Sequence, residues 1–169
     1  MTLRKSTVRP DWDDPLLTTL RSLIDAAGGL FVFASTAAGG RVPASLINAG
    51  LIEHPGSGVP VLAHVAYGDS LRVARLAKAP GASLTVHDGR KWLTAEGGAE
   101  LVFAPWDERS AEGGRGIDED GYTELLRETY RRAGGGEHPD WPEYDAAMRR
   151  ENRVVVLVGI DRLYGLHWD

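Results

Sequence analysis

The sequence predicts a small, mainly β barrel of about six antiparallel strands, to which about four helices are added. Three observations predict this fold class. Short segments rich in β-branched and aromatic residues are separated by glycine-containing turns, as in antiparallel sheets. Residues 93–103 alternate in character, the period of a strand with one buried face. The order of elements does not have the strand–helix alternation of a doubly wound parallel sheet.

The first element is expected to be a helix. Asp13 or Asp14 can cap it, Pro15 suits its first turn, and Gly28 and Gly29 end it. Its apolar residues repeat at helical spacing and form one stripe: Leu16, Leu20, Leu23, Ile24 and Ala27. The residues before it, 1–12, are expected to form a flexible arm.

After this helix the apolar period changes to that of strands. The expected strands are residues 30–36, 41–49, 59–67, 83–87, 91–103 and 153–160, the last reaching to about residue 164. Gly39 and Gly40 supply the turn between the first two strands. Gly97 and Gly98, in the middle of the fifth, predict the bulge or bend that a sheet needs in order to curl into a barrel.

Three more helices complete the expected domain, which spans residues 1–169. The first, residues 70–79, is stopped by Pro80. The other two follow Gly121, and their apolar stripes are Tyr122, Leu125, Leu126 and Tyr130, then Trp141, Tyr144 and Met148. Residues 105–120 are glycine-rich and acidic, and are expected to form a mobile loop.

Composition excludes several classes of protein. The net charge of −5 argues against nucleic acid as the main partner, because a phosphate backbone favours a basic face. The chain has no cysteine, which excludes disulfides, thiolate catalysis and thiolate metal sites. No apolar run follows the basic first residues or approaches a membrane span, so we expect a cytoplasmic protein without a membrane partner.

The short helix at residues 70–79 carries the most informative charge pattern. Arg72, Arg75 and Lys78 lie on one arc of it, opposite an arc formed by Val73, Ala74, Leu76 and Ala77. Three cations on one arc repel each other unless an anion is present. Ser70 lies near the helix N-terminus, where free backbone N–H groups also favour an anion. The alternative is an ordinary solvated face on an amphipathic helix.

Four passages, in this order, resemble one family. They are GGRVPASLINAG, SLRVARLAKAP, KWLTAEGGAELV and HPDWPEYDAAMRRENRVVVLVGIDRLYGL. Together they resemble the pyridoxamine 5′-phosphate oxidase-like, FMN-binding split barrels, and in particular the actinobacterial F-420 (deazaflavin)-dependent oxidoreductases of that class. The resemblance covers nearly the whole chain. It implies a split β-barrel homodimer with two equivalent cofactor sites in the dimer interface.

The resemblance also assigns residues to the cofactor. Arg72 matches a basic residue that holds the cofactor phosphate, and Arg75 and Lys78 match less certain positions. The second strand resembles the one that lines the ring system, through Ser45, Ile47 and Asn48. Trp92 resembles an aromatic residue that reaches the site from the partner chain; its alternative is an aromatic of the core or interface.

The function implied is hydride transfer from reduced coenzyme F-420 to a small organic acceptor. Such chemistry needs no nucleophile or metal, and the five histidines, His54, His64, His87, His138 and His167, show no metal-ligand spacing. No catalytic residue is assigned; His64 is either a proton donor or a satisfied strand histidine. The acceptor pocket is expected to involve the second strand, the 54–58 loop, the helices after Gly121 and the partner chain.

Three alternatives stay open. The cofactor could be FMN, as in pyridoxamine phosphate oxidases or flavin reductases. The former end in an arginine-rich segment, however, whereas this chain ends DRLYGLHWD, with Arg162 as its one late arginine. The protein could instead be a non-catalytic carrier or sensor of the same cofactor. Haem binding, with His167 as an axial ligand, is the weakest alternative.

Overall fold

The computed structural model describes residues 2–7, 9–111 and 116–167. Its strands are β1 (Thr2–Thr7), β2 (Leu30–Ser35), β3 (Ala44–Asn48), β4 (Gly50–Glu53), β5 (Pro60–Tyr67), β6 (Gly81–His87), β7 (Trp92–Val102), β8 (Arg153–Gly159) and β9 (Arg162–His167). Its helices are α1 (Pro15–Ala26), α2 (Leu71–Lys78), α3 (Glu119–Tyr130) and α4 (Trp141–Arg150). Short helical turns occur at Ala38–Gly40, Glu108–Ala111 and Arg131–Gly135.

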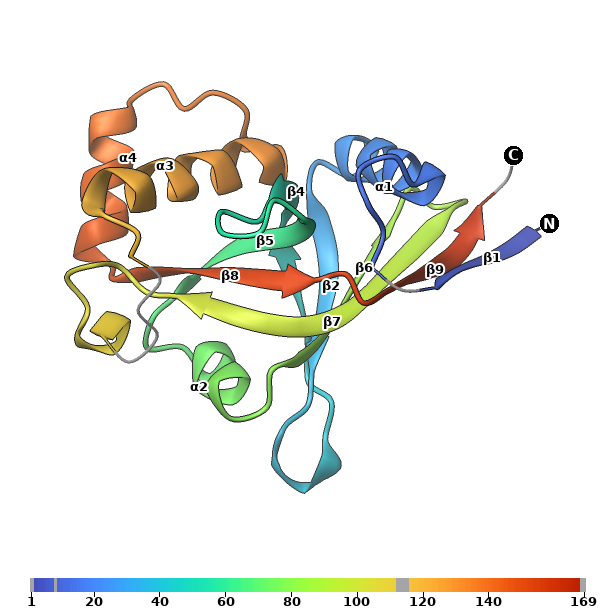
Figure 1. Cartoon of the computed structure of the whole chain (residues 1–169), viewed down its shortest axis with the longest axis horizontal. Coiled ribbons are helices and arrows are strands. Elements are labelled where there is room, and N and C mark those ends of the chain that lie inside the picture. Colours follow the sequence, from blue (N-terminus) through green and yellow to red (C-terminus); the bar gives the residue numbers. More distant parts are fainter. Residues whose placement is uncertain (1, 8, 112–115, 168–169) are drawn as a thin grey trace.

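The strands form one curled antiparallel sheet with the order β3-β2-β6-β7-β8-β5-β4, and β9 joins β7 to β1 (Figure 1). Strand β7 organises the sheet, because β8 and β9 follow one another along one of its edges. Gly97 lies where they meet: a Cβ there would be 1.9 Å from the carbonyl oxygen of Gly159. The close approach requires glycine at this position, and the pairing of β7 with β6 runs through Gly97 and Gly98 without the expected bulge.

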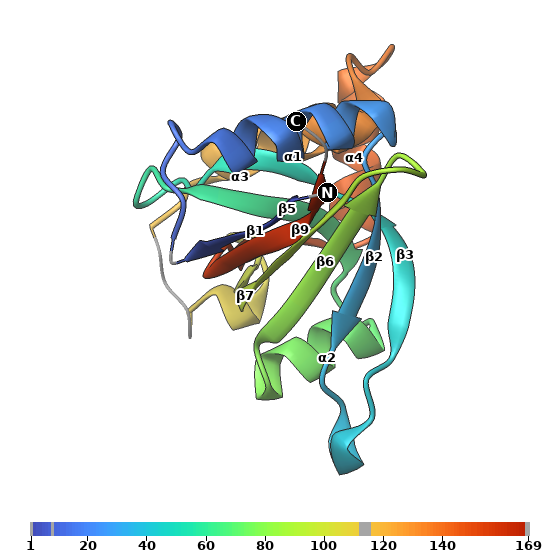
Figure 2. The ribbon, with the colours of Figure 1, turned by 90° about the vertical axis from the view of Figure 1, so that its right-hand side faces the viewer.

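The helices cover different parts of the sheet (Figures 1 and 2). Helix α1 packs over one end of the curl and α2 lies at the opposite end, and both contribute buried residues to the core inside the curl. Helices α3 and α4 pack on the β5 and β8 side and form a second core around Tyr122. The turn that joins β2 to β3 projects beyond the sheet.

This architecture confirms the mainly β fold class, with more strands than the sequence indicates. Residues 50–53, which lie outside every expected strand, form β4 because they pair with β5. The final strand divides into β8 and β9 at Ile160 and Asp161, and the backbone N–H of Asp161 donates to the carbonyl of Glu96.

Two segments expected to be flexible contain regular structure. Thr2–Thr7, within the expected arm, forms β1 and pairs antiparallel with β9 along its whole length. Within the expected loop at 105–120, Glu108–Ala111 forms a short helical turn, and residues 112–115 lie outside the described residues. In the described part of the chain, no helix is long and apolar enough to cross a membrane.

Candidate functional site

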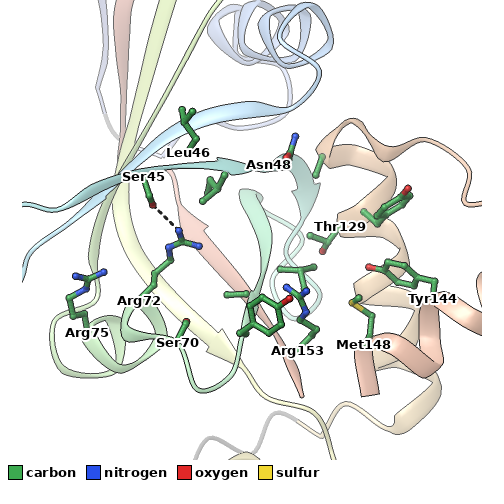
Figure 3. A pocket seen from close by; sticks show the side chains of 16 residues that line it. Ser45, Leu46, Asn48, Ser70, Arg72, Arg75, Thr129, Tyr144, Met148 and Arg153 are labelled. Atoms are coloured by element: carbon green, nitrogen blue, oxygen red, sulfur yellow. Dashed lines mark hydrogen bonds between the residues drawn. The ribbon is translucent and has the colours of Figure 1, made fainter. Parts of the chain in front are cut away.

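A cavity of about 640 Å³ lies between the edge strand β3, helix α2 and helices α3 and α4 (Figure 3). This volume is in the range of pockets that hold cofactors and drug-sized ligands. Its walls come from four parts of the chain: Ser45, Leu46, Ile47 and Asn48; Val65, Ala66, Tyr67, Ser70, Arg72 and Arg75; Thr129, Tyr130 and Ala133; and Tyr144, Met148 and Arg153. None of these lining residues is acidic.

One wall of the cavity is cationic. Arg72 donates from Nη2 to Ser45 Oγ at 2.7 Å, and its guanidinium lies 5.1 Å from the centre of the Phe33 ring. Ser70 caps α2, because its Oγ accepts from the backbone N–H of Val73 at 3.3 Å. Arg72 and Arg75 are both half-buried, on the side of α2 that faces the cavity.

The charges of this wall have no acidic partner among the described residues. Among the residues that the structure describes, no carboxylate forms an ion pair with Arg72 or Arg75. Within the same residues, the buried Nε of Arg75 has no hydrogen-bond partner. Burial, and then repulsion by Arg75, lower the pKa of Arg72. A bound anion would relieve both effects, so the wall is suited to phosphate oxygens.

Strand β3 forms the adjoining wall and is an edge of the sheet, pairing with β2 alone. An edge strand has backbone N–H and C=O groups that its single neighbour does not use, and these can bind a ligand. Ile47 is buried, with 8% of its surface exposed. Asn48 lines the cavity, but its amide nitrogen donates to the carbonyl of Gly28 at 3.2 Å. Its side chain therefore braces the turn before β2.

The opposite wall, from α3 and α4, is uncharged. Figure 3 shows Thr129, Tyr144 and Met148 across the cavity from the two arginines. The hydroxyl of Tyr144 donates to the carbonyl of Leu126 at 3.2 Å, and its ring centre lies 5.1 Å from that of Tyr130. This wall therefore presents aromatic and thioether surface.

Tyr67 and Arg153 also line the cavity. The Arg153 guanidinium is 3.4 Å from the centre of the Tyr67 ring, a close cation–π contact. Arg153 also pairs with Glu151 at 2.7 Å. Its charge is therefore partly compensated, unlike that of Arg72.

His64 lies buried next to this site, with 1% of its surface exposed. Its ring contacts Phe33 edge to face at 5.3 Å, and neither ring nitrogen has a hydrogen-bond partner among the described residues. Burial, and then the charge of Arg72, lower the pKa of His64 to about 3. His64 is therefore neutral near pH 7 and lacks the acidic proton that a donor role requires. Within the described residues it is not a hydrogen-bonded strand histidine either.

The structure brings five of the seven residues expected at the cofactor to this cavity: Ser45, Ile47, Asn48, Arg72 and Arg75. Lys78 is exposed on α2 and lies outside it. Trp92 lies on the outer face of the sheet, 6.3 Å from the ring of Tyr164, also outside this chain's cavity. On α2, Ala74 and Ala77 are exposed rather than buried, and only Val73 and Leu76 enter the core.

Of the other segments expected to line the acceptor pocket, some line this cavity and one does not. The helices after Gly121 do line the cavity, whereas the 54–58 loop borders a separate cavity of about 570 Å³ beside Trp12. Tyr67 and Arg153 were not expected at the site, and only their place at strand ends beside α2 could have indicated it. Within the described residues, no three histidine, aspartate or glutamate side chains gather as a metal site would require. The side chain of His167 lies outside the described part of the chain.

The fold has relatives among solved structures, although no family model matches the sequence. A pyridoxamine 5′-phosphate oxidase-related, FMN-binding protein from Nostoc punctiforme superposes with a TM-score of 0.60 at 12% identity, over 91% of this chain and 85% of that one. An F420 reductase gives 0.54 at 14% identity, over 85% and 94%. An FAD- and haem-binding protein from Mycobacterium smegmatis gives 0.56 at 16% identity, over 95% and 71%.

These likenesses define the class of fold. The chain has the split-barrel fold of pyridoxamine 5′-phosphate oxidase-related proteins. Neighbours with this fold bind different flavin-type cofactors. Identities of 12 to 16% show a shared fold, and function has to be argued from the site itself.

Proposed function

We propose that this protein binds a flavin-type cofactor in the cavity beside α2 and uses it as an oxidoreductase. The observation that carries the proposal is the pair Arg72 and Arg75, two half-buried cations with no carboxylate partner among the described residues. Arg72, Ser45 and the N-terminal end of α2 would hold the cofactor phosphate. Lys78, exposed one turn further on, would add only longer-range attraction.

The rest of the cavity suits the ring system and the acceptor. The free edge of β3, from Ser45 to Asn48, offers backbone donors and acceptors to a polar ring edge. A reduced deazaflavin or flavin supplies a hydride when bound. This chain would bind and orient the cofactor and the acceptor and exclude water from them. Tyr144 and Met148 provide apolar surface on which a planar acceptor could lie.

Coenzyme F-420 is our first choice of cofactor, with a small organic acceptor as substrate. It rests on the four ordered passages that resemble the F-420-dependent group. FMN is the second candidate, favoured by the FMN-binding neighbour with a TM-score of 0.60. Both carry a phosphate, and the cationic wall can hold either. A carrier without turnover would use the same residues.

We also propose that two copies of the chain associate through the outer face of the sheet. Leu46, Val32, Thr85, Thr94 and Tyr164 are successive cross-strand neighbours there, on five strands. This row carries no charge, and Leu46 and Val32 are 65% and 39% exposed. An uncharged, partly apolar β face of this kind suits an isologous dimer.

In the proposed dimer, Trp92 would lie beside that row and reach towards the partner's cofactor. Light scattering during size exclusion tests the association: a dimer is expected, and Leu46→Glu should convert it to a monomer. A monomeric unmodified chain at tens of micromolar would overturn this part of the proposal.

The cofactor is tested by titrating the purified protein with F-420 and with FMN at matched ionic strength, following fluorescence quenching. Micromolar binding of F-420 with much weaker FMN binding is expected. The reverse result would establish the FMN alternative, and binding of neither would overturn the proposed function. Oxidation of reduced F-420 with a panel of acceptors then separates an enzyme from a carrier.

The phosphate site is tested with Arg72→Ala. A lost charged hydrogen bond should weaken cofactor binding by about 1.5–3 kcal/mol, a factor of at least ten. Lys78→Ala is the matched comparison, because it removes the same charge from the same helix but lies outside the cavity. Equal losses from the two variants would indicate a diffuse charge effect and not a built phosphate site.

A further inference from the structure

The turn that leads into α2 is hydrogen-bonded to a charged pair, Asp107 and Arg109, and neither residue of the pair lines the cavity. Arg109 donates from Nη1 to the carbonyl oxygen of Gly68 at 2.8 Å. Gly68 lies between Tyr67 and Ser70, both of which line the cavity, and the N–H of Ser70 donates to the Tyr67 carbonyl at 3.1 Å. Arg109 thus bonds directly to the turn that begins the cationic wall.

Asp107 fixes the Arg109 side chain. The guanidinium donates from Nε to Oδ1 at 2.9 Å and from Nη2 to Oδ2 at 2.6 Å, a bidentate pair. The Arg109 side-chain hydrogen bonds lower the pKa of Asp107 to about 2, so the pair is charged throughout the neutral range. The guanidinium also stacks 4.3 Å from the centre of the Phe103 ring. Few rotamers satisfy all of these contacts together.

The same pair also contacts Asn152, the residue before the cavity residue Arg153. Asn152 donates from Nδ2 to Asp107 Oδ2 at 3.1 Å, and its carbonyl accepts from the Gly68 N–H at 3.0 Å. Its backbone has a positive φ of 45°, a conformation that needs support in a residue other than glycine. The next residue, Arg153, lines the cavity.

Gly68 shows how tightly the turn is enclosed. A Cβ at this position would lie 2.7 Å from the Asn152 carbonyl oxygen and 2.9 Å from Nη2 of Arg109. The turn therefore has little room to move towards the Asp107–Arg109 pair. Its position, and with it the start of α2, depends on where that pair holds Gly68.

We propose that Asp107 and Arg109 are positioning residues for the anion-binding end of the cavity. They place the turn at residues 67–70 so that Arg72 lies within 2.7 Å of Ser45 Oγ. The proposal rests on the proposed function in one respect, namely that Arg72 binds a phosphate. Neither residue lines the cavity, so neither is expected to touch the ligand.

A matched pair elsewhere in the chain separates positioning from general stability. Arg127 makes a similar bidentate contact with Asp145 between α3 and α4 and lies 5.4 Å from the Trp141 ring centre. It borders a different, polar cavity. Arg109→Met and Arg127→Met therefore each remove a bidentate arginine–aspartate pair. Only the Arg109 pair contacts the turn before α2.

The binding test compares FMN with riboflavin, and F-420 with its phosphate-free chromophore. Arg109→Met is expected to lower the affinity for the phosphate-bearing ligand roughly tenfold and to change the affinity for the phosphate-free ligand little. Arg127→Met should leave both affinities unchanged at a similar loss of Tm. Adding Arg109→Met to Arg72→Ala should weaken binding no further, because both act on one contact. Equal losses for ligands with and without phosphate, or an additive double variant, would overturn the inference.

A ligand-free measurement keeps this inference separable from the proposed function. Amide hydrogen exchange should quicken at residues 67–74 in Arg109→Met and stay unchanged there in Arg127→Met. Unchanged exchange in Arg109→Met would overturn positioning, whatever the ligand. If Arg72→Ala leaves cofactor binding intact while exchange responds as expected, the phosphate site is wrong and the positioning of α2 stands. Arg109→Lys should not restore binding, because one ammonium cannot replace the fork-shaped contacts.

Discussion

His64 gives the most quantitative prediction about stability. It is a buried imidazole whose two nitrogens have no hydrogen-bond partner among the described residues. We expect His64→Leu to stabilise the protein at pH 8 by about 1–3 kcal/mol, the cost of leaving a buried polar group unsatisfied. Leucine has a similar volume and can keep the contact with Phe33.

The same residue sets a pH dependence. The pKa of His64 is lowered from 6.5 to about 3 on folding, so below pH 6.5 the unfolded chain takes up a proton that the folded chain does not. Stability that is fully present above pH 6.5 is therefore lost as the pH falls towards 3. At pH 5 the loss is about 2 kcal/mol, from 1.36 kcal/mol per pH unit. In the leucine variant this component is absent.

Urea denaturation at pH 8, 7, 6 and 5 measures both effects as free energies of unfolding. The difference between His64→Leu and the unmodified protein should widen by about 2 kcal/mol from pH 8 to pH 5. His87→Leu is the control, because His87 is exposed on β6. A difference that stays constant over this range would refute the reasoning, since His64 would then not be neutral and desolvated in the folded state.

Two other substitutions test the fold. Gly97→Ala should destabilise by about 2 kcal/mol or more, because its Cβ would lie 1.9 Å from a β8 carbonyl oxygen, whereas Gly98→Ala has open space; thermal denaturation of both checks the contrast. Asp107→Asn should remove acid-dependent stability: the folded pKa of about 2 lies below the ordinary 3.8, so about 2 kcal/mol present above pH 4 is lost as the pH falls to 2. Urea midpoints between pH 5 and pH 2 measure it, and an unchanged pH slope would contradict it.

Elements with a strong local signal could be predicted from the sequence. Helix α1 has its cap at Asp14, proline in its first turn and a regular apolar stripe, and it forms at Pro15–Ala26. The long strand β7 forms where its alternation predicts a strand, although Thr94 and Val102, on the face expected to be exposed, are also buried. Both signals lie within one segment, so no knowledge of neighbours is needed.

Elements that exist only because of a partner could not be predicted in this way. Strand β4 is four residues long and pairs with β5, and β1 pairs with β9, which lies at the other end of the chain. Their sequences carry little periodicity of their own. Cross-strand pairing provides most of the stabilisation in such short strands, and no local pattern reports it.

The cationic wall of the cavity was predictable because it is also local. Arg72 and Arg75 are three residues apart on one helix and both face the cavity. Lys78 continues the spacing but not the face: at 100° per residue it is rotated about 120° from Arg72 and lies about 9 Å further along the axis. Residues spaced three apart rotate by about 60° per step around a helix of 3.6 residues per turn. Arg72 and Arg75 therefore both line the cavity, whereas Lys78 does not.

The aromatic wall, by contrast, is assembled by tertiary structure. Thr129 and Tyr130 end α3, Tyr144 and Met148 lie on α4, and the sequence indicates only that these helices have apolar stripes. A stripe that packs on the sheet and one that borders a cavity look alike until the helices are placed. The two ends of the cavity therefore come from independent parts of the fold. If the proposed function is right, substitutions in α3 and α4 should alter which acceptor binds without weakening the contact between Arg72 and the phosphate.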